Sequence, residues 1–162
     1  RIHAAMVEAE AAAQRQPLEN LHWTVESICL PPREDLTEET LLAEIKDAAG
    51  DRAKVHSKAA LMLTYLRRQN RPIPVTCLHL NEQTAIVHLP GETFIEYQLH
   101  TQAARPDAFV AVAGYGDLGT GYITLASSFA EGGYEPKDAF VSGGAEQILR
   151  DAITRVVDSS SR

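Results

Sequence analysis

The segment VHLPGETF at residues 87–94 places an acidic residue just after a predicted strand. Ligands of open α/β sheets bind beyond the carboxyl ends of the strands. We expect Glu92 to begin a helix, whose dipole and free amide groups stabilise an ionised carboxylate that can bind a metal ion or act as a base. The simpler interpretation is a favourable charge in a first helical turn. His88 is either a ligand-contacting residue or, since it alternates with Val87 and Leu89, a solvent-facing strand residue.

A glycine-rich segment, GYGDLGTGY at residues 114–122, follows the next apolar strand. It matches the G-x-G-x-x-G dinucleotide-binding pattern, but that pattern needs a helix at the third glycine and an acidic residue about 20 positions further on. The residues at 122–124 favour extended chain instead. The other use of such glycines is a sharp turn that presents Tyr115, Asp117 or Tyr122 to a ligand.

No complete metal or nucleophile site is visible in the sequence. The six histidines are scattered, with no H-E-x-x-H motif and no pair four residues apart, and there is no G-x-S-x-G motif. Cys29 and Cys77 each lie in an apolar, strand-like run. They can form a disulfide or remain thiols, and neither has a local catalytic context.

The elements that must position these residues alternate between helices and strands. Apolar spacing predicts helices at 2–16, 38–49, 52–69, 92–104 and 145–157. Thr37 is expected to cap the second helix, and Leu61 to lie on the apolar stripe of the third. Strands are predicted at 23–30, 75–80, 84–89 and 109–113, the middle two forming a β-hairpin with a turn at residues 81–82.

This order predicts an α/β fold with a mixed β-sheet flanked by helices. No internal repeat or linker is visible, so residues 1–162 are expected to be a single domain or a fragment of one. The chain opens with Arg1 and a helix-favouring run, without an initiator Met or a signal peptide. We therefore expect an internal start, with any targeting signal upstream.

The composition excludes several kinds of partner. The chain is 44% hydrophobic and 23% charged, as ordinary globular domains are, and its net charge is −7. Its basic residues gather only in the short group Arg67, Arg68 and Arg71, so we expect no binding to nucleic acid or to anionic membrane surfaces. The apolar runs fall well short of the roughly 18 residues that span a bilayer, so no transmembrane segment is expected.

Four of these segments, in this order, resemble the C-terminal catalytic half of the neutral, non-lysosomal ceramidases, and above all their shorter bacterial relatives. They are HLPGETF at residues 88–94, the apolar strand that follows, the glycine-rich turn with GYIT at 121–124, and FAEGGYE at 129–135. The match extends over about residues 73–157, and the preceding helices fit more loosely.

The resemblance implies a fragment of a zinc-dependent hydrolase that cleaves the linear amide C–N bond of an N-acyl sphingoid lipid. Such enzymes hold zinc with two histidines from the N-terminal half, the glutamate of a Pro-Gly-Glu motif and a later tyrosine. The glutamate falls on Glu92 and the tyrosine on Tyr122, with Tyr115 as the second choice, whereas the two histidines match nothing in this chain. A bound metal lowers the pKa of its water to about 7, which suits hydrolysis.

The resemblance also implies partners and a location. The expected partners are the N-terminal half of the same catalytic domain and a lipid-like amide substrate, and the expected location is exported or periplasmic. The family pattern differs here in a shorter Glu-to-Tyr interval and in Gly132-Gly133, which leaves the substrate undefined. The alternative is a non-catalytic binding or structural domain that kept the fold and lost the metal.

Overall fold

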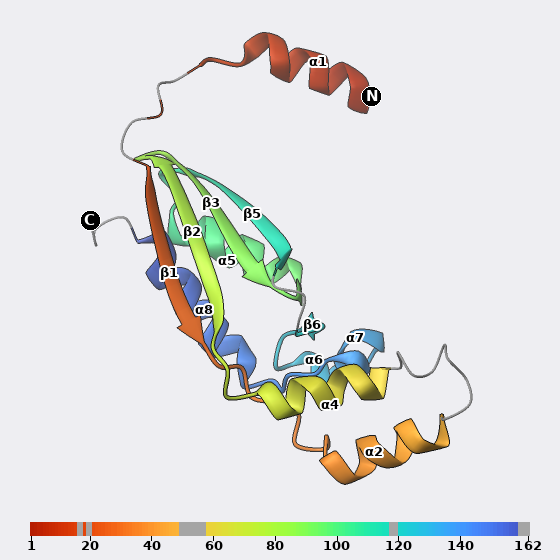
Figure 1. The fold of residues 1–162 in the computed structure, drawn as a ribbon. Helices are drawn as coiled ribbons and strands as arrows, with labels where there is room; N and C mark the ends of the chain where they lie inside the picture. Colours follow the sequence, from red (N-terminus) through yellow and green to blue (C-terminus); the bar gives the residue numbers. More distant parts are fainter. Residues whose placement is uncertain (16–17, 19–20, 49–57, 117–119, 159–162) are drawn as a thin grey trace.

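The computed structural model describes residues 1–15, 18, 21–48, 58–116 and 120–158 (Figure 1). Its helices are α1 (Ile2–Ala12), α2 (Glu38–Asp47), α4 (Lys58–Arg68), α5 (Ile95–Ala104), α6 (Ser128–Glu131), α7 (Tyr134–Asp138) and α8 (Ala145–Val157). Its strands are β1 (His22–Ile28), β2 (Ile73–Asn81), β3 (Thr84–Pro90), β4 (Glu92–Thr93), β5 (Phe109–Gly116) and β6 (Tyr122–Ile123).

The main sheet has the strand order β1-β2-β3-β5. The first three strands are antiparallel, and β5 lies parallel to β3, which confirms the predicted mixed sheet and its hairpin. The hairpin turn lies one residue later than expected, at Glu82 and Gln83, because the Asn81 side chain accepts a hydrogen bond from the Gln83 amide at 2.8 Å. Strands β4 and β6 form a separate parallel pair.

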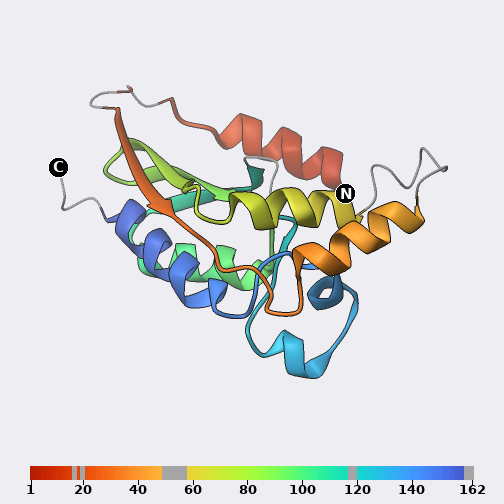
Figure 2. The ribbon, with the colours of Figure 1, turned by 60° about the horizontal axis from the view of Figure 1, so that its bottom comes forward.

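One face of the main sheet packs against α5 and α8 (Figures 1 and 2). Alternate strand residues such as Val75, Cys77 and Val87 point into this layer and are fully buried. On α8, Leu149, Ile153 and other apolar residues recur at helical spacing and are buried against them. This layer forms the larger hydrophobic core.

A second, smaller core lies between α2 and α4. Leu41 of α2 packs with Met62 and Leu63 of α4, and Thr37 caps α2 as predicted by accepting a hydrogen bond from the Thr40 amide at 3.2 Å. Leu61 is not on the buried stripe, because the packed face of α4 is centred on Met62 and Leu63 and leaves Leu61 56% exposed.

The opposite face of the main sheet carries apolar side chains without a covering layer in the described part of the chain. Trp23 is 50% exposed there, Val25 is also exposed, and Phe109 at the sheet edge is 70% exposed. Helix α1 lies beyond the end of the sheet in Figure 1 and has no buried residue. We call this surface, defined by Trp23, Val25 and Phe109, the open face.

Several element ends differ from the predictions. The first helix ends at Ala12 and not at residue 16, because Ala13 is already extended. Helix α5 begins at Ile95, and the predicted start of the third helix, residues 52–57, lies outside the described residues. Short helices α6 and α7 occupy a stretch for which we predicted neither a helix nor a strand.

The two cysteines are free thiols. Cys77 is buried in β2, and burial raises the pKa of its thiol to about 11. Cys29 is exposed at the end of β1. The possible disulfide is thus not formed.

Candidate functional site

Strands β4 and β6 bring the two predicted metal ligands together. They pair in parallel, with Glu92 opposite Tyr122 and Thr93 opposite Ile123. Residues in register on neighbouring strands project from the same face of a sheet. The Glu92 and Tyr122 side chains therefore lie side by side and half-buried, although the two residues are far apart in the sequence.

Backbone hydrogen bonds join the segments of β4 and β6 to each other and to the end of β5. They run from Gly91 N to Gly116 O (3.0 Å), Glu92 N to Gly121 O (2.9 Å), Phe94 N to Ile123 O (3.2 Å) and Tyr115 N to Gly91 O (2.7 Å). Gly91 has a φ of +61°, and a Cβ on it would lie 2.6 Å from the Gly121 carbonyl oxygen. The close approach therefore requires glycine at position 91.

Tyr115 also reaches Glu92, from the end of β5. Its backbone adopts the left-handed conformation, with φ of +63°, and its side chain is exposed. A hydrogen bond to Glu92, followed by the negative charge of that carboxylate, raises the pKa of the Tyr115 phenol above its usual value. Glu92 thus lies between two tyrosines, and the geometry keeps both Tyr122 and Tyr115 as candidate ligands.

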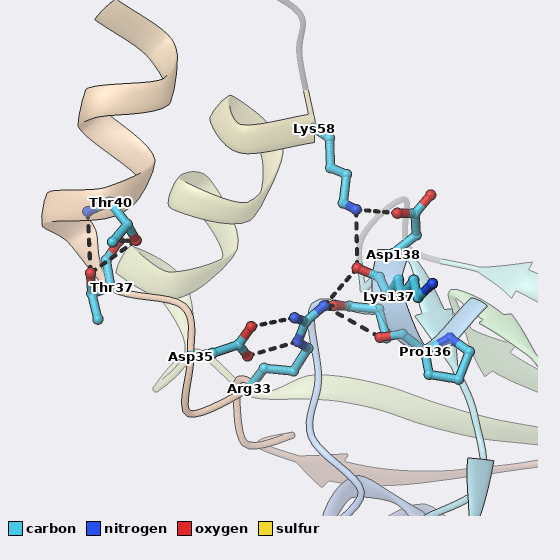
Figure 3. Close-up of polar contacts among 9 residues, drawn as sticks. Arg33, Asp35, Thr37, Thr40, Lys58, Pro136, Lys137 and Asp138 are labelled. Carbon is cyan, nitrogen blue, oxygen red and sulfur yellow. Dashed lines mark hydrogen bonds and ion pairs between the residues drawn. The ribbon is translucent and has the colours of Figure 1, made fainter. Parts of the chain in front are cut away.

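Tyr122 is in turn supported from α7. Its ring meets that of Tyr134 edge to face, with ring centroids 5.8 Å apart. The pKa of Tyr134 is raised, first by its hydrogen bond to Asp138 and further by nearby Tyr122. Lys58 at the start of α4 forms an ion pair with Asp138 and lowers the pKa of that carboxyl (Figure 3). Sequence reasoning missed Tyr134, Asp138 and Lys58, although Tyr134 lies in the FAEGGYE segment.

Arg33 fixes the chain around α7 (Figure 3). Its guanidinium donates to the carbonyl oxygens of Pro136 (3.3 Å), Lys137 (2.7 Å) and Ala139 (3.3 Å), and it forms an ion pair with Asp35. A planar guanidinium can satisfy several acceptors at once. The segment that carries Tyr134 is therefore anchored to the chain between β1 and α2.

One buried hydroxyl borders the strand pair. Thr120 is fully buried, and its Oγ1 has no hydrogen-bond partner among the residues that the structure describes. It lies against Gly91, since a Cβ added there would approach it to 2.1 Å. Buried hydroxyls normally have a partner, so this one is of the kind that a bound ligand or water satisfies.

The structure also bears on the expectations for the helix start at Glu92 and for His88 and Asp117. Glu92 does not begin a helix, because its backbone pairs with β6 and α5 starts only at Ile95, so the helix-dipole argument for its ionisation was wrong. The His88 ring lies against Trp23 on the open face, with centroids 5.8 Å apart. Asp117 lies outside the described residues.

The glycine-rich turn does not lead into a helix. After Thr120 and the left-handed Gly121 the chain enters β6, and the next helix begins only at Ser128. A dinucleotide site would need a helix N-terminus at the third glycine to hold the pyrophosphate. The described residues after the turn therefore agree with the alternative prediction, a sharp turn that places Tyr122 at the site.

The metal-binding capacity of this site rests on oxygen donors. Glu92 offers a carboxylate, and Tyr122 and Tyr115 offer phenol oxygens, all of which suit a Lewis-acidic cation. Over the described ranges no group of three His, Cys, Asp or Glu could hold a metal ion. A catalytic zinc normally has three protein ligands, so these oxygen donors alone are fewer than a complete zinc site needs.

Comparison with known proteins supports the fold. No family model matches the sequence, and no curated protein matches it. Among solved structures it is similar to the neutral ceramidase from Pseudomonas aeruginosa, with a TM-score of 0.53 and 18% sequence identity. The match covers 94% of this chain and 31% of that one, so the chain has a ceramidase-like fold and spans about a third of that protein's length. None of the described helices is long and apolar enough to cross a membrane.

Proposed function

We propose that this chain is the C-terminal part of the catalytic domain of a zinc-dependent amide hydrolase, and that Glu92 and Tyr122 are its share of the metal ligands. The observation that carries the proposal is the parallel pairing that places Glu92 opposite Tyr122. The ceramidase-like fold supports it. The substrate class is an N-acyl amide of a lipid-like amine.

The residues present fit part of a zinc site. Glu92 supplies a carboxylate oxygen, and Tyr122 supplies a phenol oxygen that a nearby cation would favour as phenolate. The Thr120 hydroxyl, which has no partner among the described residues, borders the same strand pair. When bound, zinc would lower the pKa of a water molecule and polarise the amide carbonyl. In this chain the Tyr134 ring packs edge to face against Tyr122, and the Tyr115 phenol interacts with the Glu92 carboxylate.

The zinc ligands that are missing from the described residues are expected from outside this chain. The expected source is the N-terminal half of the same catalytic domain, which the family resemblance assigns two histidines. The open face gives that half a surface to pack against, because Trp23, Val25 and Phe109 are apolar and exposed. Exposed apolar patches of this kind mark interaction sites in soluble proteins.

A non-catalytic domain with the same fold is the second candidate. The specific observation in its favour is the absence of a complete three-ligand group from the described residues. It predicts that a longer protein containing this chain also lacks stoichiometric zinc, so metal analysis separates the two candidates.

The test uses a longer protein that carries this chain together with the N-terminal half. Zinc is measured by mass spectrometry and turnover with an N-acyl lipid amide. Glu92→Gln and Tyr122→Phe should each lower zinc occupancy or turnover by about tenfold or more, because each removes a ligand. Tyr115→Phe should do less.

Three results would contradict the proposal. Unchanged zinc and turnover in Glu92→Gln would remove its basis, and a larger effect of Tyr115→Phe than of Tyr122→Phe would make Tyr115 the ligand. Stoichiometric zinc with rapid hydrolysis by residues 1–162 alone would show that the metal site is not divided.

A further inference from the structure

A cavity of about 560 Å³ lies between the C-terminal end of α4 and the turn before β6. Its volume falls within the range of small-molecule sites, roughly 300–1,000 Å³. Gly121 and Phe140 form one side, and a Cβ on Gly121 would lie 3.3 Å from the Phe140 ring. The cavity thus borders the strand pair but is formed mainly by other residues.

Two arginines line this cavity, Arg68 at the end of α4 and Arg71 in the turn that follows. The Arg71 amide donates to the Arg68 carbonyl oxygen at 2.8 Å, which holds the two residues in one turn. Neither guanidinium forms an ion pair with any residue that the structure describes, whereas neighbouring Arg67 is paired with Glu38. The chain is acidic overall, with 15 basic and 22 acidic residues. The two guanidinium groups without an ion pair among the described residues therefore make this cavity a local site of positive charge.

The rest of the lining is mixed, with polar groups on Thr64, Tyr65 and Gln69 beside an apolar surface. Leu61 is exposed toward this cavity and not packed in the α2–α4 core, and Pro72, Ile73 and Phe140 extend the apolar surface. An apolar pocket with a few polar groups at one place fits a ligand that is itself apolar with one polar end. Because Arg68 and Arg71 are positively charged, they favour a ligand whose polar end is an anion.

We propose that this cavity binds a carboxylate carried on an apolar chain, such as a fatty acid. Arginine pairs with carboxylates through two parallel hydrogen bonds, and two guanidinium groups can hold one such group from two sides. The carbonyl end of α4 also borders the cavity, and its partial negative charge repels a doubly charged phosphate more than a singly charged carboxylate. The site uses neither Glu92 nor Tyr122, so it does not depend on the proposed zinc site.

The test is calorimetric titration of the 162-residue chain with decanoate, without added metal. Arg68→Gln combined with Arg71→Gln should weaken decanoate binding roughly ten- to a hundredfold, since hydrogen bonds to charged groups contribute about 1.5–3 kcal/mol. Arg67→Gln is the matched control and should bind as the unaltered chain does. Decanol should bind at least about tenfold more weakly than decanoate.

Four results would overturn the inference. They are the absence of decanoate binding, equal binding by the double variant, equal binding of decanol, and binding of inorganic phosphate or decyl phosphate as tight as that of decanoate. Circular dichroism of each variant shows whether the fold is kept. If the double variant is unfolded, Leu61→Asp replaces it and should weaken decanoate binding, because it adds a repelling charge to the apolar wall.

Discussion

Gly91 and Gly121 let two distant segments approach closely enough to pair Glu92 with Tyr122. Both have left-handed backbone conformations, with φ of +61° and +58°. Their surroundings differ, because a Cβ on Gly91 would meet the Gly121 carbonyl oxygen at 2.6 Å, whereas a Cβ on Gly121 would meet the Phe140 ring at 3.3 Å. A backbone oxygen held in a strand pair cannot move aside as a ring can.

Gly91→Ala should therefore destabilise the chain more than Gly121→Ala. The left-handed conformation costs an alanine about 1–2 kcal/mol at either position, and only Gly91→Ala adds a clash with the backbone. Urea unfolding of the two variants measures the difference. Equal losses of stability would mean that the Gly121 carbonyl oxygen does not restrict the space at Gly91.

The residue types at the site were predictable from the sequence, but their supports were not. Glu92 stands out because it follows a predicted strand, and strand ends in α/β sheets carry sites, whereas Tyr122 was preferred to Tyr115 only through the family resemblance. The expectation that Glu92 begins a helix failed because a two-residue strand is set by its partner on β6, which lies far away in the sequence. Tyr134 supports Tyr122 through tertiary packing, which leaves no periodic signal.

At the scale of elements, the short helices α6 and α7 owe their position to contacts and not to their own helical tendency. Four or five residues are too few for an independently stable helix. Arg33 donates to three carbonyl oxygens in and just after α7, and Lys58 adds an ion pair to Asp138. Helix α7, which carries Tyr134, is therefore stabilised by side chains from other parts of the chain.

Arg33→Gln should lower the free energy of unfolding by about 1–3 kcal/mol, because charged donors to the carbonyl oxygens are lost. Arg67→Gln is the control, since its exposed pair with Glu38 contributes at most about 1 kcal/mol. Limited proteolysis should cut Arg33→Gln faster between residues 129 and 140. Similar stability and cleavage in both variants would show that Arg33 does not anchor α7.

The longer elements were predictable for a physical reason that the short ones lack. Helix α8 and the strands β2 and β3 repeat apolar residues over several turns or alternations, so their local pattern agrees with their burial. In α5, Ile95 and Leu99 have the spacing of one apolar helix face, yet both are exposed and Tyr97 is buried. The Tyr97 hydroxyl donates to the Thr124 carbonyl oxygen at 2.9 Å, a partner that the sequence pattern cannot show.

At the scale of the whole molecule, helices cover one face of the main sheet, whereas the open face has no covering layer among the described residues. The matched solved structure is about three times as long as this chain, which covers 31% of it. A further part of the domain that packs on the open face would bury Trp23 and Val25. Burial of that apolar surface would stabilise the association.

Trp23→Lys should therefore have different effects in the two forms of the protein. In residues 1–162 it should change stability by less than about 1 kcal/mol, because the side chain is half exposed. In the longer protein it should cost several kcal/mol, since it would bury an unpaired charge. Leu99→Lys, on the exposed side of α5, should be tolerated in both. An equal effect of Trp23→Lys in both forms would show that the open face stays open.

The central claim, that Glu92 and Tyr122 bind one zinc ion, is tested most directly by a crystal structure of the longer protein grown with zinc, with data collected at the zinc absorption edge. We expect one anomalous peak about 2.0–2.2 Å from a carboxylate oxygen of Glu92, with the Tyr122 phenol oxygen as a second ligand from this chain. A zinc ion bound without Glu92, or no zinc near β4 and β6, would contradict the account.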